Sequence, residues 1–315
     1  MRVIGSIATN TFREAVRQPV YLLVVGLGCV VAFFSQYFTF FAFGEEKSMI
    51  KEMGLATVSL CGLLLAVFSS SSVIADEIEK LTVLTILCKP VKRWEFIVGK
   101  FFGILLAVLV AFLILGVVFL AAVWFAELPF SYVRALYGHV DPDWEPNQPR
   151  DFGELVAKTW ANLSTYLPGT GLLMIKGLVL AYFQVVVIVA IAVAVSTRLP
   201  MIVNMVVCAT VYAFGHVSNS LTLYFYPSGP TGEKLVAQTD ALGLLTILGK
   251  YPGLGVMQIL RTLAPNLENF NVWDDIAFGF NVPVEYMGIV VLYGLVYATM
   301  MLLVAIVLFR GREAA

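Results

Sequence analysis

The chain alternates between long runs of apolar residues and short charged segments. Charged residues are absent from six windows, which cover residues 20–43, 54–75, 101–126, 177–197, 199–226 and 286–309. Each window is long enough to cross a hydrocarbon core of about 30 Å as a helix. The pattern therefore predicts six transmembrane helices, at about 20–43, 54–75, 97–126, 170–197, 199–226 and 284–309.

The residues before the first window are not continuously apolar, but their apolar positions recur at helical spacing. In residues 1–19, apolar side chains recur at Ile7, Phe12 and Val16, arginines occupy other positions, and Pro19 follows. This spacing predicts an amphipathic helix that ends before the proline. A basic amphipathic helix next to a membrane span typically lies in the headgroup plane. A cytoplasmic helix packed on protein would show the same pattern and stays an alternative.

Composition points to the same class of protein. Hydrophobic residues make up 60% of the 315 residues and charged residues 13%, about half of the charged fraction of an average soluble domain. The mean hydropathy is +0.89. We therefore expect an all-α polytopic membrane protein in which residues 1–315 form a single transmembrane domain.

The distribution of basic residues predicts the orientation. With six spans both termini lie on one side, and that side holds eleven of the twenty Lys and Arg residues in short flanks. The remaining nine are mostly spread through the two long loops, 127–169 and 227–283, which weigh little in the positive-inside rule. Both termini and residues 76–96 are therefore predicted to be cytoplasmic, and the two long loops extracytoplasmic.

The cytoplasmic segment 76–96 and the start of the next helix are unusually rich in charge. Nine charged residues of both signs fall between two apolar spans: Asp76, Glu77, Glu79, Lys80, Lys89, Lys92, Arg93, Glu95 and Lys100. Orientation needs only basic residues, whereas a docking surface uses both signs for register and specificity. The segment therefore favours a protein contact, although a loop that only fixes orientation remains possible. Trp94 is placed for the interface, and Gly99 and Gly103 have the spacing of a close helix contact.

The sequence lacks the residues that several classes of protein usually need for their function. None of the spans carries an ionisable group at its middle, where ion-coupled transporters usually place one. His216, toward the outer half of the fifth span, is either a hydrogen-bonded structural histidine or a pathway residue. The stretch "GPTGEKL" (229–235) has two residues between its glycines rather than four, so it is not a phosphate loop. The acidic turn around Asp141 lacks the turn glycine of a calcium loop. We expect no enzyme active site and no metal site.

The motifs around the charged segment resemble those of ABC-2 type transporter permeases, in the group of multi-copper enzyme maturation permeases. The matching positions are Glu77, Glu79, Thr82, Lys89, Pro90, Val91, Arg93, Glu95, Phe96, Gly99 and Lys100. The N-terminal "NTFREAVRQ" (10–18), "LAPNLENFNVWD" before the last span and the basic ending "FRGR" are similar as well.

The resemblance implies an ABC-2 (type V exporter-like) permease fold and an exporter in the plasma membrane, here the bacterial inner membrane. It implies that residues 76–96 are a coupling segment that binds a separate cytoplasmic ABC ATPase. The implied coupling residues are Asp76, Glu77, Glu79, Lys80, Thr82, Lys89, Pro90, Arg93, Glu95 and Lys100, with Arg198 at the hairpin between the fourth and fifth spans.

The expected partners are that ATPase, a second permease copy and the lipid bilayer, with no nucleic acid. ATP and Mg²⁺ would bind the ATPase, and this chain would hold no cofactor. Two other classes remain as alternatives: a secondary transporter or channel that works without an ATPase, and a membrane scaffold for an extracytoplasmic partner.

Overall fold

The computed structural model describes residues 2–35, 46–75, 92–127, 167–225 and 265–310, and this part of the chain contains helices and no strand. The long helices are α1 (Arg2–Arg17), α2 (Pro19–Phe34), α3 (Glu46–Ser70), α6 (Arg93–Glu127), α9 (Leu172–Ser196), α10 (Met201–Phe225) and α15 (Val284–Arg310). The short ones are the π-helices η3 (Ser71–Ala75) and η4 (Leu167–Gly171), the 3₁₀-helix η5 (Glu268–Phe270) and α14 (Trp273–Ala277).

Four helical stretches in the described residues are long and apolar enough to cross a membrane: Ser48–Val73, Trp94–Trp124, Gly169–Ser196 and Val284–Phe309. There is a fifth candidate if α1 and α2, whose axes are bent by 64° relative to each other, form one broken span. Four of the six predicted spans therefore correspond to helices of membrane-spanning length, and the count of six is not confirmed. The predicted first span begins as α2, and the fifth corresponds to α10, whose apolar part covers Met201–Val217.

Local sequence explains where most helices begin and end. Pro19 opens α2, because the ring fixes the helical φ angle and the missing N–H is not needed in the first turn. The turn between α9 and α10 contains Arg198 and Pro200, as expected. Two helices begin earlier than predicted. α3 begins at Glu46, within the predicted outer loop, and α6 begins at Arg93 rather than near 97. Charged first turns explain the difference, since a helix can continue beyond the apolar part of its sequence.

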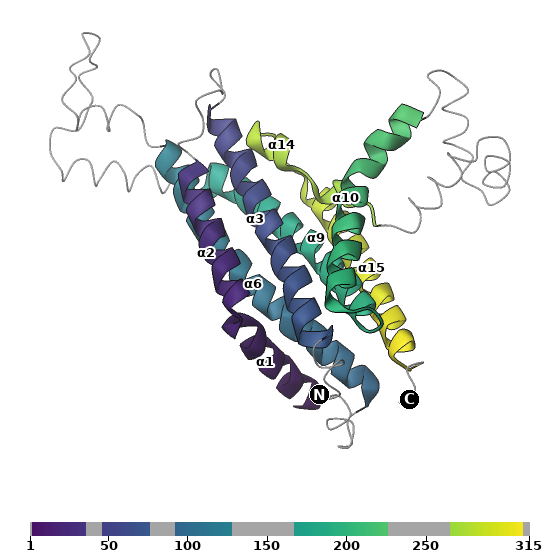
Figure 1. Ribbon diagram of the computed structural model, residues 1–315. Coiled ribbons are helices and arrows are strands. Elements are labelled where there is room, and N and C mark those ends of the chain that lie inside the picture. Colours follow the sequence, from purple (N-terminus) through teal and green to yellow (C-terminus); the bar gives the residue numbers. More distant parts are fainter. Residues whose placement is uncertain (1, 36–45, 76–91, 128–166, 226–264, 311–315) are drawn as a thin grey trace, which may run out of the picture.

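The long helices lie side by side, and α9 is the most enclosed of the four membrane-length helices (Figure 1). α15 lies at the edge of the bundle and is the most exposed of them. The beginning of α1 and the end of α15 lie at the same end of the bundle, the lower end in Figure 1. This end also contains η3 and the α9–α10 turn.

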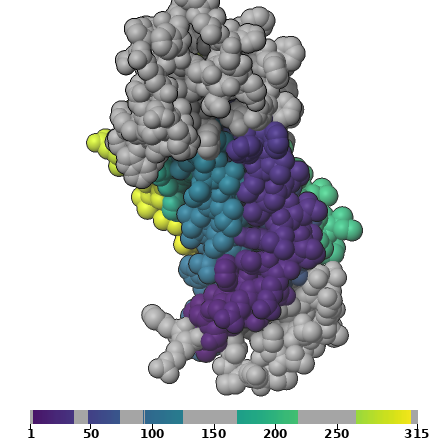
Figure 2. Space-filling view, turned by 90° about the vertical axis from the view of Figure 1, so that its left-hand side faces the viewer, coloured from purple at the N-terminus to yellow at the C-terminus, as the bar shows by residue number. Residues whose placement is uncertain are grey.

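α1 packs along the first half of α6. Gly99 and Gly103 of α6 provide the contact surface, because a Cβ atom at Gly103 would lie 2.7 Å from the carbonyl oxygen of Ala8 and one at Gly99 would lie 2.8 Å from Cγ2 of Ile7. Thr11 of α1 is completely buried there. Figure 2 shows this face, with the purple N-terminal helices beside the blue α6. The predicted close helix contact is confirmed, and its partner is the amphipathic helix.

At the opposite end, residues 265–277 lie across three helices, and we call them the docked segment. Each of three fully buried side chains of this segment contacts a glycine of a different long helix. The pairs are Leu267 with Gly215 of α10, Phe270 with Gly294 of α15 and Ile276 with Gly177 of α9. Two tyrosines of α15 add hydrogen bonds: the Tyr293 hydroxyl accepts from the backbone N–H of Asn266 at 3.0 Å, and the Tyr286 hydroxyl donates to the carbonyl oxygen of Asn269 at 2.9 Å.

Candidate functional site

The helix that leads into the charged segment ends in a run of serines. Ser70 and Ser72 donate hydrogen bonds to the carbonyl oxygens of Ala66 (2.7 Å) and Phe68 (2.9 Å), one turn earlier in the same helix. Serine hydroxyls compete in this way with the backbone N–H groups and bend helices. The helix widens here into η3, a π-helix of five residues, which is a conformation common at functional sites.

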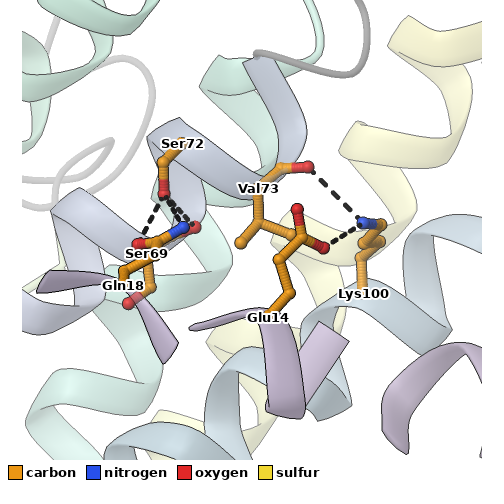
Figure 3. Close-up of polar contacts among 6 residues, drawn as sticks. All are labelled: Glu14, Gln18, Ser69, Ser72, Val73 and Lys100. Atoms are coloured by element: carbon orange, nitrogen blue, oxygen red, sulfur yellow. Dashed lines mark hydrogen bonds and ion pairs between the residues drawn. The ribbon is translucent and has the colours of Figure 1, made fainter. Parts of the chain in front are cut away.

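The first contact of this serine run is with the junction of α1 and α2. Gln18, between these two helices, donates from Nε2 to Oγ of Ser72 at 2.8 Å, and the Ser72 hydroxyl lies 3.0 Å from the Gln18 Oε1 (Figure 3). Both residues are half-buried. The bend between α1 and α2 is therefore tied directly to η3.

The second contact is made by Lys100 of α6, whose exposed fraction is 2%. Its ammonium group donates to the carbonyl oxygen of Val73 at 3.5 Å and lies 3.7 Å from the Glu14 carboxylate of α1 (Figure 3). It also lies 5.7 Å from the centre of the Phe96 ring. The Val73 carbonyl belongs to η3, the last turn that the structure describes before residue 76. One cation thus connects α1, η3 and α6.

The third contact is with α10. Asn204, fully buried in the first turn of this helix, donates from Nδ2 to Oγ of Ser71 at 2.8 Å. Its Oδ1 accepts a weaker hydrogen bond from the thiol of Cys208 at 3.4 Å. A buried amide between helices is costly unless it is hydrogen-bonded, so this pair fixes the position of α10 against η3.

These contacts form one site, which we call the serine junction. Its residues are Glu14, Gln18, Ser71, Ser72, Val73, Lys100 and Asn204. They come from four separate parts of the chain and surround the last described turn before residue 76. The junction therefore fixes η3, which directly precedes the charged segment in the sequence, and Lys100 connects η3 to α6, the helix that follows this segment.

Most of the predicted coupling residues lie outside the described part of the chain. These are Asp76, Glu77, Glu79, Lys80, Thr82, Lys89 and Pro90. Arg93 begins α6 rather than belonging to the segment before it. Glu95, half-buried, accepts a hydrogen bond from the backbone N–H of Lys92 at 3.2 Å and so caps the start of α6. Arg198 is exposed in the α9–α10 turn.

Lys100 differs from the role that the resemblance implied. Because its side chain is buried among α1, η3 and α6, it is not a surface contact for a partner protein in this conformation. Lys100 instead connects η3, which precedes the charged segment, to α6, which follows it.

Sequence reasoning missed the partners in the serine junction. Four consecutive serines, Ser69–Ser72, in an otherwise apolar span were a usable signal, since hydroxyls in a span usually bond to a neighbouring helix or to their own backbone. Glu14 and Gln18 gave no comparable signal, because charged and polar residues are expected on one face of an amphipathic helix. Among the described residues, no group of three or more His, Cys, Asp or Glu side chains is arranged to hold a metal ion.

The fold and composition define the class as an all-helical protein with the features of a multi-pass membrane protein. Comparison with protein-family models and with curated proteins finds no significant match to this chain.

Proposed function

We propose that the chain is the membrane-spanning permease subunit of an ABC transporter, coupled to a separate cytoplasmic ATPase and working as a pair of permease copies. The proposal extends to the ABC-2 fold, export and a bacterial inner membrane with cytoplasmic termini, all of which rest on the family resemblance. The structural observation that supports it is the serine junction, because a segment that receives force from a partner needs a fixed connection to the helices it moves.

The connection has a mechanical consequence. Val73 precedes the charged segment and Lys100 follows it, and the 3.5 Å contact between them joins positions 27 residues apart. Lys100 also contacts Glu14 of α1, and Ser71 contacts Asn204 of α10. A push on the segment would therefore reach α1, α3, α6 and α10 together. Such linked rigid helices can alternate between two packings, as alternating access requires.

The remaining predicted contacts fit this arrangement. Arg198 is exposed, and it lies six residues before Asn204, which contacts η3. The α9–α10 turn and η3, which precedes the charged segment, thus both lie near the contact between Ser71 and Asn204. A partner that binds the segment could also contact Arg198, and the two would form one docking surface of mixed charge.

The first experiment is purification of the chain from its native membranes in mild detergent, with mass spectrometry of the proteins that accompany it. A stoichiometric soluble protein with a phosphate-loop motif is expected. Its absence, with the chain folded, would reject the proposal in favour of a transporter or scaffold that works alone. Nucleotide-independent transport in vesicles would identify the former, and capture of a partner through residues 127–169 or 227–283 the latter.

The second experiment separates docking from coupling. Arg93→Glu should leave insertion intact and detach or uncouple the ATPase, whereas Arg13→Glu, an exposed basic residue on α1, should leave binding unchanged. Lys100→Met should still bind the ATPase but lower transport. This variant loses the buried contact between α6 and η3 and keeps the docking surface. Equal ATPase binding and transport in Arg93→Glu and the wild type would contradict the docking assignment.

A further inference from the structure

The outer face of α1 carries two arginines, Arg13 and Arg17, whose side chains are exposed. They are four residues apart, so they lie one helical turn apart on the same face of the helix. Neither forms an ion pair or a side-chain hydrogen bond with another described residue. The single acidic residue of α1, Glu14, contacts the buried Lys100 at 3.7 Å instead. The positive charge of the two arginines is therefore not balanced within α1.

The contacts of α1 and α2 along α6 show the level at which the two arginines lie. On one side of them in the sequence, Thr11 packs on Gly103. On the other side, the Tyr21 hydroxyl donates to the carbonyl oxygen of Ala107 at 3.0 Å. Residues 101–126 of α6 carry no charge. The arginines therefore lie beside the first turns of this uncharged stretch.

Two other helices pass from charged to uncharged sequence at the same level. The uncharged window of α2 starts at residue 20, directly after the end of α1. The uncharged window 54–75 ends in η3, and η3 is hydrogen-bonded to the α1–α2 bend through Ser72 and Gln18. In a bundle that spans a membrane, this level is the boundary between the hydrocarbon and the headgroups. The two arginines thus lie at the depth of lipid phosphates.

An exposed apolar surface begins directly after the arginines. Leu22 and Leu23, in the first turns of α2, have exposed fractions of 65% and 66%, and Leu27 is exposed as well. α1 and α2 lie on the same face of the bundle, which Figure 2 shows. Guanidinium groups followed by exposed leucines match both parts of a phospholipid, the anionic headgroup and the apolar chains. The acidic surface of a soluble protein would match only the arginines.

We propose that Arg13 and Arg17 bind the headgroup of an anionic phospholipid whose acyl chains lie along α2. Their guanidinium N–H groups donate to the phosphate oxygens, and two arginines one helical turn apart can share one phosphate. A zwitterionic headgroup carries a cation next to its phosphate, and the arginines repel this cation. Anionic phospholipids therefore bind more tightly than zwitterionic ones.

The lipid site adjoins the serine junction. Arg13 directly precedes Glu14, which contacts Lys100 of α6. Arg17 directly precedes Gln18, which contacts η3. A ligand that binds one position of α1 more tightly than another stabilises the position that it prefers. A lipid bound to both arginines therefore holds α1 against α6, where the contact between Glu14 and Lys100 is formed.

The test is a titration of the purified full chain with phosphatidylglycerol in a neutral detergent, in which native mass spectrometry counts the bound lipids. Arg17→Gln should weaken the tightest binding step about fivefold, as expected for the loss of one basic residue at an anionic surface. Lys92→Gln is the matched control, because it also removes one exposed positive charge but lies about three helical turns before Gly103. It should weaken binding less than about twofold. Phosphatidylcholine should bind more weakly and show no difference between the two variants.

A second readout uses the contact between Lys100 and α1. Acetylation of Lys100 should be about fivefold slower in nanodiscs of phosphatidylglycerol than in nanodiscs of phosphatidylcholine, if displaced α1 loses the lipid contact of one arginine. This difference should be absent in the double variant Arg13→Gln/Arg17→Gln. Because both arginines are exposed, the unfolding of this variant in neutral detergent should match that of the wild type, which confirms that it is folded.

Three results would overturn the proposal. The first is equal phosphatidylglycerol binding by the wild type, Arg17→Gln and Lys92→Gln. The second is displacement of the lipid by an equal concentration of inorganic phosphate, which would identify a site for small anions. The third is the loss of an accompanying soluble protein from Arg17→Gln with lipid binding intact, which would assign the arginines to a protein partner. Neither lipid readout needs nucleotide or an ATPase, so the result is independent of the proposed transport function.

Discussion

The contact between α1 and α6 can be tested with a single methyl group. In Gly103→Ala the new Cβ would lie 2.7 Å from the carbonyl oxygen of Ala8, where ordinary contacts begin at 3.4 Å. It would also lie 2.5 Å from Cβ of Thr11, and a side-chain rotation moves neither this atom nor the backbone oxygen. α1 therefore has to move away by about 0.9 Å, which forfeits roughly a quarter to a half of the dispersion energy of the atoms that separate.

Such overpacking costs about 1–3 kcal/mol. The matched control is Gly5→Ala on α1, where a Cβ would have no atom within 4 Å. Both variants gain the higher helix propensity of alanine, so the difference between them isolates the clash. Unfolding in mixed micelles should show Gly103→Ala to be less stable than Gly5→Ala by about 1–3 kcal/mol.

The same displacement should expose Lys100. This side chain has an exposed fraction of 2%, and one of its contacts is Glu14 on α1. Acetylation of Lys100, followed by mass spectrometry, should be about tenfold faster in Gly103→Ala if the docking of α1 weakens by 1.4 kcal/mol. Equal stability and equal Lys100 labelling in the two glycine variants would refute the account of the α1–α6 contact.

Three further experiments test the other contacts, and each measures the free energy of unfolding. Asn204→Ala should cost about 1 kcal/mol, because it removes an interhelical hydrogen bond in a membrane-type bundle, whereas Thr210→Ala, an exposed hydroxyl bonded to its own helix, should cost less than about 0.5 kcal/mol. A double-mutant cycle between Gln18→Ala and Ser72→Ala should give a coupling of about 0.6 kcal/mol, and additive costs would show that this hydrogen bond is not formed. Leu267→Ala should cost about 2–5 kcal/mol from the cavity that it leaves; a cost below 1 kcal/mol would mean that the docked segment is loosely held.

Local features of the fold were predictable because their causes are close in sequence. The end of α1 before Pro19 and the tight turn at Arg198 follow from residues within one helical turn of the boundary. Four membrane-length helices followed from the length of the apolar windows. Their exact starts were less predictable, since charged first turns such as that of α6 extend a helix beyond its apolar part.

The partners in the site were not predictable from the same information. The spacing of Gly99 and Gly103 identified a face of α6 that admits close approach, but spacing does not show which helix approaches it. Lys100 contacts Glu14, 86 residues earlier in the chain, and Asn204 contacts Ser71, 133 residues earlier. Such pairs depend on the packing of whole helices. A single sequence therefore indicates that each buried polar residue needs a partner, but it does not indicate which residue the partner is.

The three glycine contacts of the docked segment also constrain the order of assembly. Synthesis proceeds from the N-terminus, so α9 and α10 exist before residues 265–277 and α15 follows last. Ile276 can pack against Gly177, and Leu267 against Gly215, as soon as the segment has been synthesised. Phe270 packs against Gly294, which belongs to α15. A chain that ends before α15 would leave a fully buried phenylalanine exposed. The contact of Phe270 with Gly294 can therefore form only after α15 has been synthesised.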